Sequence, residues 1–151
     1  MEDSKANRLE VVIADNGHGI PEDKIAEIVD PFFTTRTTRR VGLGLSLFRE
    51  AARRSEGDFE LRSREGEGTE VKATFQLDHI DRPPLGDMAG TVISLIAGHE
   101  NVDFCYTHAI DGRRLDLDTR EVKEELEDVP IHHPEVIRYL RQTIREFLTE
   151  A

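Results

Sequence analysis

The chain has 151 residues and a mass of 17.2 kDa, enough for one full domain or for one small domain with an extension. Acidic residues outnumber basic ones by 31 to 20, which gives a net charge of −11 and a pI near 5.0. This excess of negative charge argues against nucleic acid or an anionic membrane surface as a partner. The single cysteine, Cys105, excludes an internal disulfide framework and a cysteine-based metal site.

The sequence shows no signal for membrane insertion. In the C-terminal half, the longest stretch without a charged residue or histidine covers 88–98, well short of the roughly 20 apolar residues that cross a bilayer. The N-terminal residues contain no apolar signal region. We therefore expect a soluble protein that resides in the cytoplasm and has no membrane partner.

Charge and proline content divide the chain. Residues 1–77 carry a net charge of −3, and the remainder carries −8. Between them, 78–86 contains a Pro-Pro pair, which disfavours regular structure and favours extended backbone. The sequence thus predicts a first domain over 1–77, a linker over 78–86 and an extension over 87–151.

The first part alternates between strand and helix patterns. The expected elements are, in chain order, a strand over 9–14, a helix that begins at Pro21, a helix over 43–55, and strands over 58–64 and 69–77. Along the last two strands, apolar residues alternate with polar ones, so one face of the sheet is expected to be covered. This order predicts a two-layer α/β sandwich with its helices on one face of the sheet.

The second part predicts a small α/β extension. Its expected elements are a helix over 85–98, strands over 102–110 and 113–117, a short helix from 118 and a final helix from 133. Asp111-Gly112 between the strands is a strong signal for a two-residue hairpin turn. We expect Cys105 to be a small core residue on the first strand, and the extension to pack on the first domain or on a partner.

The glycines of the first part indicate chemistry. Asp15 ends the first strand and is followed by Gly17 and Gly19, so a fixed carboxylate acceptor lies beside backbone that a ligand can approach closely. This arrangement suits a flat ring that carries an amino group. Further on, a glycine-containing segment over 42–46 begins a helix, where free N–H groups and the helix dipole favour an anion such as phosphate.

Arginines concentrate around this second glycine segment. Six arginines and a single acidic residue, Glu50, lie between Thr34 and Arg54, although the chain as a whole is acidic. A local positive region in an anionic protein indicates an anionic small ligand. The usual phosphate loop and dinucleotide turn are both absent from the sequence. A solvated helix face remains an alternative explanation for the arginines of the helix, Arg49, Arg53 and Arg54.

These motifs resemble a known family. Four boxes over about residues 9–77 match the ATP-binding boxes of sensor histidine kinases in order and spacing: Asp15-x-Gly17-x-Gly19-Ile20, Pro31-Phe32-Phe33-Thr34-Thr35, Gly42-Leu43-Gly44-Leu45-Ser46 and Gly66-x-Gly68-Thr69. The same superfamily includes DNA gyrase B, the MutL repair protein and a major class of chaperones. The resemblance implies part of a histidine-kinase-like ATPase fold.

The resemblance also implies roles for individual residues. Asp15 would accept a hydrogen bond from the adenine amino group, Thr69 would join it through water, and residues 31–41 would form a lid over ATP. The expected nucleotide-binding residues are Asp15, Gly17, Gly19, Ile20, Phe33, Thr34, Thr35, Arg36, Arg39, Gly42, Leu43, Gly44, Leu45 and Thr69.

Two features of the family have no counterpart in this sequence. The family places an asparagine-bearing helix, which holds Mg²⁺, ahead of the first glycine box, and a phosphoacceptor-histidine helix further upstream. We expect ATP and Mg²⁺ as cofactors, with no Mg²⁺ ligand and no catalytic residue identified in this chain. Phosphoryl transfer is accordingly expected to require the missing N-terminal segment.

Two functions remain open at this point. In the first, the chain binds ATP or ADP as part of a histidine-kinase-like ATPase in signal transduction. In the second, it is a nonenzymatic regulatory interaction module built on a degenerate ATPase fold. Without the asparagine-bearing helix, an apolar patch should be exposed, so we expect a protein partner or a homo-oligomer.

Overall fold

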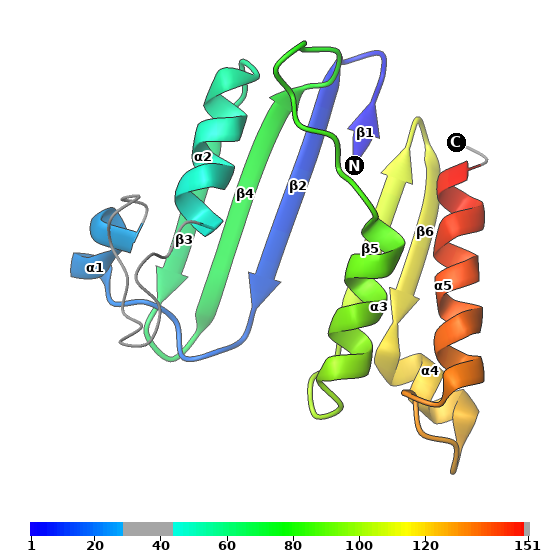
Figure 1. The fold of residues 1–151 in the computed structure, drawn as a ribbon. Helices are drawn as coiled ribbons and strands as arrows, with labels where there is room; N and C mark the ends of the chain where they lie inside the picture. The colour runs from blue at the N-terminus through cyan, green and yellow to red at the C-terminus, as the bar shows by residue number, and fades with distance from the viewer. Residues whose placement is uncertain (29–43, 150–151) are drawn as a thin grey trace. The chain divides into compact units, whose positions relative to one another are not determined.

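A computed structural model of the chain describes residues 1–28 and 44–149. The chain forms two compact units, Met1–Pro83 and Pro84–Ala151 (Figure 1). The division between them lies inside the segment that the sequence marks as a linker.

The sheet of the first unit consists of antiparallel strands. They are β1 (Glu2–Asp3), β2 (Arg8–Asp15), β3 (Phe59–Arg64) and β4 (Gly68–Gln76), in the spatial order β3-β4-β2-β1. The three longer strands confirm the sequence-based expectation to within one residue at each end. The two-residue strand β1 was not predicted, because a pair of residues carries no alternation to detect.

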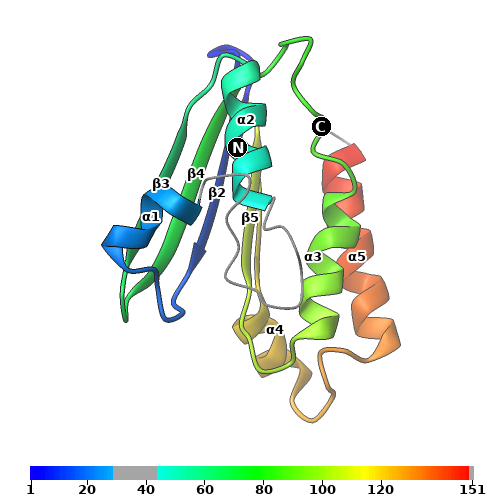
Figure 2. The ribbon, with the colours of Figure 1, turned by 60° about the vertical axis from the view of Figure 1, so that its left-hand side comes forward.

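Two helices complete the described part of this unit, α1 (Glu22–Ile28) and α2 (Gly44–Arg54). Both lie on one face of the sheet (Figures 1 and 2). Phe48 of α2 packs against Phe59 and Phe75, with ring centroids 6.1 and 5.8 Å apart. These contacts confirm the predicted two-layer α/β arrangement, in which the apolar face of β3 and β4 is buried under α2.

The helices leave part of the sheet face on which they pack exposed to solvent at β2. Ile13 pairs with Val71 and therefore lies on the same face as α2, yet it is 60% exposed. Leu47 of α2 is 59% exposed. Exposed apolar side chains of the expected kind are thus present, and association through them remains a prediction.

The second unit joins three helices to one hairpin. Its elements are α3 (Met88–Gly98), β5 (Cys105–Ile110), β6 (Arg113–Asp118), α4 (Thr119–Leu126) and α5 (Pro134–Thr149). The element types and their order confirm the small α/β extension predicted from the sequence. Asp111 and Gly112 form the turn between the strands, both with positive φ, as a two-residue hairpin loop requires.

The core of this unit lies between α3, α5 and the hairpin. Its large buried side chains include Ile93 and Ile96 of α3, Leu140 and Ile144 of α5, and Leu117 of β6. The periodic apolar residues of α3 and α5 meet there, which explains why the apolar stripe of α5 predicted its helix well.

Three details of the second unit differ from the sequence-based expectation. Strand β5 begins at Cys105 and not at 102. Cys105 is exposed and is not a core residue. Successive residues of a strand point to opposite faces, and the buried His108 places the even-numbered residues of β5 inward. Helix α3 begins at Met88 and not at 85, because Asp87 caps it by accepting a hydrogen bond from the Gly90 amide at 2.8 Å.

Helix α3 is the most apolar of the helices and has 11 residues. Within residues 1–28 and 44–149, no helix is both long and apolar enough to cross a lipid bilayer.

The core of the second unit provides a stability test. Replacing Ile144, which is 0% exposed, by alanine removes a fully buried side chain from the contact between α5 and its neighbours. The expected loss in the free energy of unfolding is about 2–5 kcal/mol. Urea denaturation measures it, with the exposed Gln142→Ala on the same helix as control. Equal midpoints for the two variants would contradict this packing.

Candidate functional site

Asp15 stands at the end of β2, where the strand gives way to a glycine-containing loop. Its Oδ1 accepts a hydrogen bond from the Gly17 amide at 2.8 Å, which fixes the orientation of the carboxylate. The side chain is exposed, so a ligand can reach it. A short polar residue at a strand end followed by glycine favours this local turn.

Thr69 lies directly opposite Asp15. The two residues are partners in the antiparallel pairing of β2 with β4, so their side chains project from the same face of the sheet. That face also carries Ile13 and Val71, and α2 packs against it. The strand pairing therefore brings together the two polar residues that the sequence analysis placed in different boxes.

Ser63 joins this pair, and the sequence analysis missed it. Its Oγ accepts a hydrogen bond from the Ile20 amide at 2.8 Å and lies 2.9 Å from the Thr69 Oγ1. It also donates to the carbonyl oxygen of Gly68 at 2.8 Å. One hydroxyl thus ties the loop after β2 to the beginning of β4.

A signal for Ser63 exists in the sequence. Phe59 and Leu61 point toward the covered face of the sheet, and Ser63 follows at the next position of that alternation. A hydroxyl at a position where an apolar side chain is expected indicates a local hydrogen-bonding role.

Glycine is required where the loop after β2 meets the β3–β4 turn. Gly19 has φ of 68°, and a Cβ there would lie 2.0 Å from the Arg64 carbonyl oxygen. Gly68 has φ of 107°, and a Cβ there would lie 2.0 Å from the Asp15 carbonyl oxygen. These close approaches hold the backbone around Asp15 and Thr69 in one geometry.

The first turn of α2 contributes Gly44 and Leu45. The N-terminal end of α2 and the C-terminal end of β2 lie at the same end of the first unit (Figures 1 and 2). Gly44 is exposed, and the first turn of α2 contains no acidic residue. Its N–H groups are therefore compatible with an anion.

The structure brings together five of the fourteen predicted residues around the β2–β4 strand pair and the loop that follows: Asp15, Gly17, Gly19, Ile20 and Thr69. A sixth and seventh, Gly44 and Leu45, begin α2. The others lie outside the described residues: Phe33, Thr34, Thr35, Arg36, Arg39, Gly42 and Leu43.

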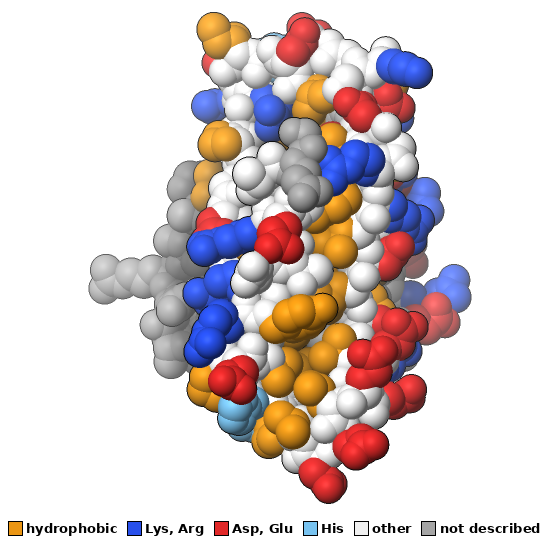
Figure 3. All heavy atoms as spheres, turned by 90° about the vertical axis from the view of Figure 1, so that its right-hand side faces the viewer, with side chains coloured by type: hydrophobic (Ala, Val, Ile, Leu, Met, Phe, Trp, Pro, Cys, Tyr) orange, Lys and Arg blue, Asp and Glu red, His pale blue; other side chains and the backbone are white. Residues whose placement is uncertain are grey.

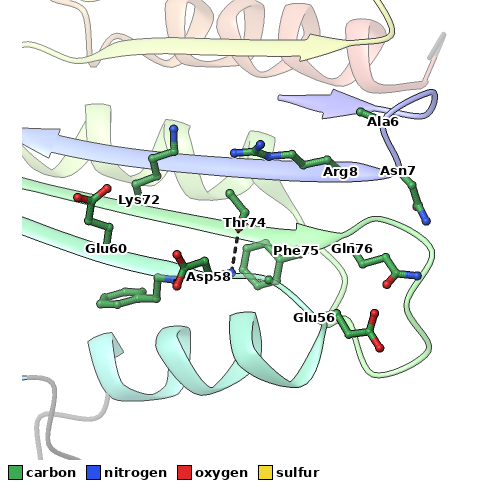
Figure 4. Close-up of a pocket in the computed structure, with 12 residues that line it drawn as sticks. Ala6, Asn7, Arg8, Glu56, Asp58, Glu60, Lys72, Thr74, Phe75 and Gln76 are labelled. Atoms are coloured by element: carbon green, nitrogen blue, oxygen red, sulfur yellow. Dashed lines mark hydrogen bonds between the residues drawn. The ribbon is translucent and has the colours of Figure 1, made fainter.

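A shallow groove of about 570 Å³ lies at the opposite end of the same strands (Figure 4). It is lined by charged residues of both signs, among them Arg8, Asp58, Glu60 and Lys72, and by none of the predicted nucleotide-binding residues. Lys72 also donates a hydrogen bond to Glu10, which lowers the pKa of that carboxyl below its usual range. The groove was not predicted, because it is assembled from the beginnings of β2 and β3 and the end of β4.

The described residues include no group of three or more His, Cys, Asp or Glu side chains that could hold a metal ion. Mg²⁺ stays an expectation that rests on the family resemblance alone.

Comparison with known proteins identifies the first unit. The profile of the histidine kinase-, DNA gyrase B-, and HSP90-like ATPase family matches residues 2–79. The sensor protein kinase PilS of Pseudomonas aeruginosa is 40% identical over 67 residues, which cover 44% of this chain and 12% of PilS. The sensor protein kinase WalK of Staphylococcus haemolyticus is 36% identical over 80 residues, which cover 50% of this chain and 13% of WalK.

A sensor-like histidine kinase of Rhizobium meliloti is 38% identical over 79 residues, which cover 49% of this chain and 15% of that protein. The chain thus spans less than a fifth of the length of these relatives, and each match is confined to about half of the chain. The matched segment contains the paired strands β2 and β4 and every predicted nucleotide-binding residue. The chain belongs to the family of histidine kinase-, DNA gyrase B-, and HSP90-like ATPases.

Proposed function

We propose that the first unit binds ATP at the β2–β4 end of its sheet, as part of a histidine-kinase-like ATPase in two-component signalling. The observation that carries this proposal is the pairing of Asp15 with Thr69 beside a loop that glycine alone can form. The family supports nucleotide binding in general, and the relatives that match are sensor kinases.

The adenine ring is the part of ATP that this geometry fits best. The exposed Asp15 carboxylate accepts a hydrogen bond from an exocyclic amino group, and the Gly17 amide holds it in place. Thr69 and Ser63 supply hydroxyls at the adjacent position. The absence of a side chain at Gly19 lets the loop pack directly on the β3–β4 turn, which holds it beside the Asp15 carboxylate.

The phosphates would extend toward the N-terminal end of α2. There the Gly42–Leu45 backbone would donate N–H groups, and Arg36 and Arg39 would add positive charge. These assignments rest on the family resemblance and on the local excess of arginine.

Phosphoryl transfer places a further demand on the protein, since it also needs groups that hold a metal against the phosphates. No metal-binding cluster is present among residues 1–28 and 44–149. The function proposed for this chain is therefore nucleotide binding, with transfer dependent on additional protein groups. We place that function in the cytoplasm, where ATP is available.

The first test changes Asp15 to asparagine. The substitution replaces a charge-assisted acceptor by an amide, and the loss of such a bond is worth about 1.5–3 kcal/mol. We expect ATP affinity to fall about 10- to 150-fold and the preference for ATP over GTP to weaken. Isothermal titration with ATP, ADP and GTP measures both effects.

The matched control is Asp58→Asn, because Asp58 lines the groove at the opposite end of the sheet. It should bind ATP as wild type does. If folded Asp15→Asn binds ATP as tightly as wild type, the adenine site is elsewhere. If wild type binds no nucleotide at millimolar concentration while folded, the nonenzymatic interaction module is the better account.

The second test changes Arg36 or Arg39 to glutamine. Because these charges are proposed to contact phosphate and not the base, triphosphate affinity should fall while the ATP-to-GTP preference stays unchanged. The loss should be largest at low salt, where screening is weakest. Arg53→Gln, near the other end of α2, is the control and should bind as wild type does. An altered base preference in Arg36→Gln or Arg39→Gln would refute the phosphate assignment.

A further inference from the structure

Strand β6 forms an open edge of the second unit. It pairs with β5 on one side, with Thr107 opposite Asp116 and His108 opposite Leu115. Among residues 1–28 and 44–149, no strand pairs with its other side. Such an edge presents backbone N–H and C=O groups that can pair with another strand.

An apolar seam follows this edge between β6 and α5. Phe147 of α5 contacts both strands of the hairpin, since Arg113 of β6 lies over its ring at 5.2 Å and the ring centroids of Phe147 and His108 of β5 are 5.9 Å apart. By helical spacing, Val136 and Tyr139 lie on the same side of α5 as Phe147. Tyr139 is 70% exposed, and Leu115 of β6 is half-buried beside the core. On the face that α5 and β6 present, hydrophobic side chains form a band with charged side chains on both sides (Figure 3).

The charged residues of β6 are complementary to those of a second, antiparallel copy of the same strand. Arg114 and Asp116 both point away from the helices and flank Leu115. Within one chain their side chains contact each other, with Nε and Oδ2 2.6 Å apart, and both are more than half exposed. Asp116 also accepts a hydrogen bond from the Thr107 hydroxyl at 2.7 Å, so a second copy at the open edge would exchange the ion pair within one chain for ion pairs between chains.

Antiparallel pairing of β6 with β6 of a second chain would bring these opposite charges together. With Leu115 opposite Leu115, Arg114 of each chain faces Asp116 of the other, and the leucines meet on the helix side. A shift by two residues in one direction places Arg114 opposite Arg114. In the other direction it places Asp116 opposite Asp116 and Arg114 opposite Asp118, which already pairs with Arg120 and caps α4. A shift by one residue directs the leucines to the charged face. One register therefore satisfies both charge and polarity.

We propose that the β6 edge and the apolar seam form a two-fold interface with a second copy of this chain. The two hairpins then make one continuous sheet, with Leu115 of each copy at the two-fold axis. A two-fold contact uses the same surface on both copies, which the Arg-Leu-Asp pattern of β6 provides. This surface belongs to the second unit and does not depend on nucleotide binding.

Charge reversal tests the interface with the full chain. Arg114→Asp places like charges opposite each other twice in the dimer, and so does Asp116→Arg. We expect either variant to lower dimer affinity about tenfold or more in sedimentation velocity. A mixture of the two variants restores both ion pairs in the heterodimer, and the double variant R114D/D116R restores them in a homodimer. Recovery of dimer in both samples would show that the single variants failed through charge and not through misfolding.

A control and a register test accompany the reversal. Leu47→Lys alters the exposed apolar residue of α2 in the first unit. It should leave the β6 dimer intact, because any association through the apolar residues of the first unit is a separate contact. In a Cys105→Ser background, Leu115→Cys should form an intermolecular disulfide, whereas Gln142→Cys on the exposed side of α5 should not.

Three results would overturn the proposal. One is a wild-type chain that stays monomeric at high micromolar concentration, and another is an Arg114→Asp variant that dimerises as wild type does. The third is loss of the dimer in Leu47→Lys alone, which would assign association to the apolar residues of the first unit.

Discussion

The antiparallel pairing of β2 with β4 is the constraint on which the first unit depends. Its register buries Leu9 and Phe75 at one end and sets Asp15 opposite Thr69 at the other. A slip of one residue would turn the apolar residues of β2 to the open face and carry the Asp15 carboxylate with them. Packing and the candidate site are therefore determined by the same ladder of backbone hydrogen bonds.

The turns beside this pair of strands restrict which residues can occupy the candidate site. The loop after β2 and the β3–β4 turn approach each other so closely that a Cβ at Gly19 or Gly68 would overlap backbone oxygen. Ser63 closes the remaining gap with hydrogen bonds to Ile20 and Gly68. The stability of the first unit and the geometry around Asp15 and Thr69 are thus set by the same few residues, and alanine at either glycine should disturb both.

Much of this arrangement could be predicted from the sequence, for identifiable reasons. The alternation of Val71, Ala73 and Phe75 predicted the buried face of β4. Glycines at fixed spacing predicted a nucleotide site, which stays a prediction. Cys105 was predicted to be a core residue but is exposed. The segment 102–110 mixes apolar and polar residues, so its sequence does not indicate whether the odd-numbered or the even-numbered residues are buried. Ser63 was missed because its partners, Ile20 and Gly68, meet it only in the folded chain. The groove opposite Asp15 was missed for the same reason.

The central claim is that nucleotide binds at the Asp15 end of the first unit and not in the groove at the other end of its strands. Hydrogen exchange of the full chain with and without ATP tests it most directly, because each segment reports its own protection. We predict slower exchange over residues 16–20 and 63–69 when ATP is bound, with no change over 56–60 and 72–76. Protection confined to 56–60 and 72–76, or no protection in either region at saturating ATP, would contradict the account.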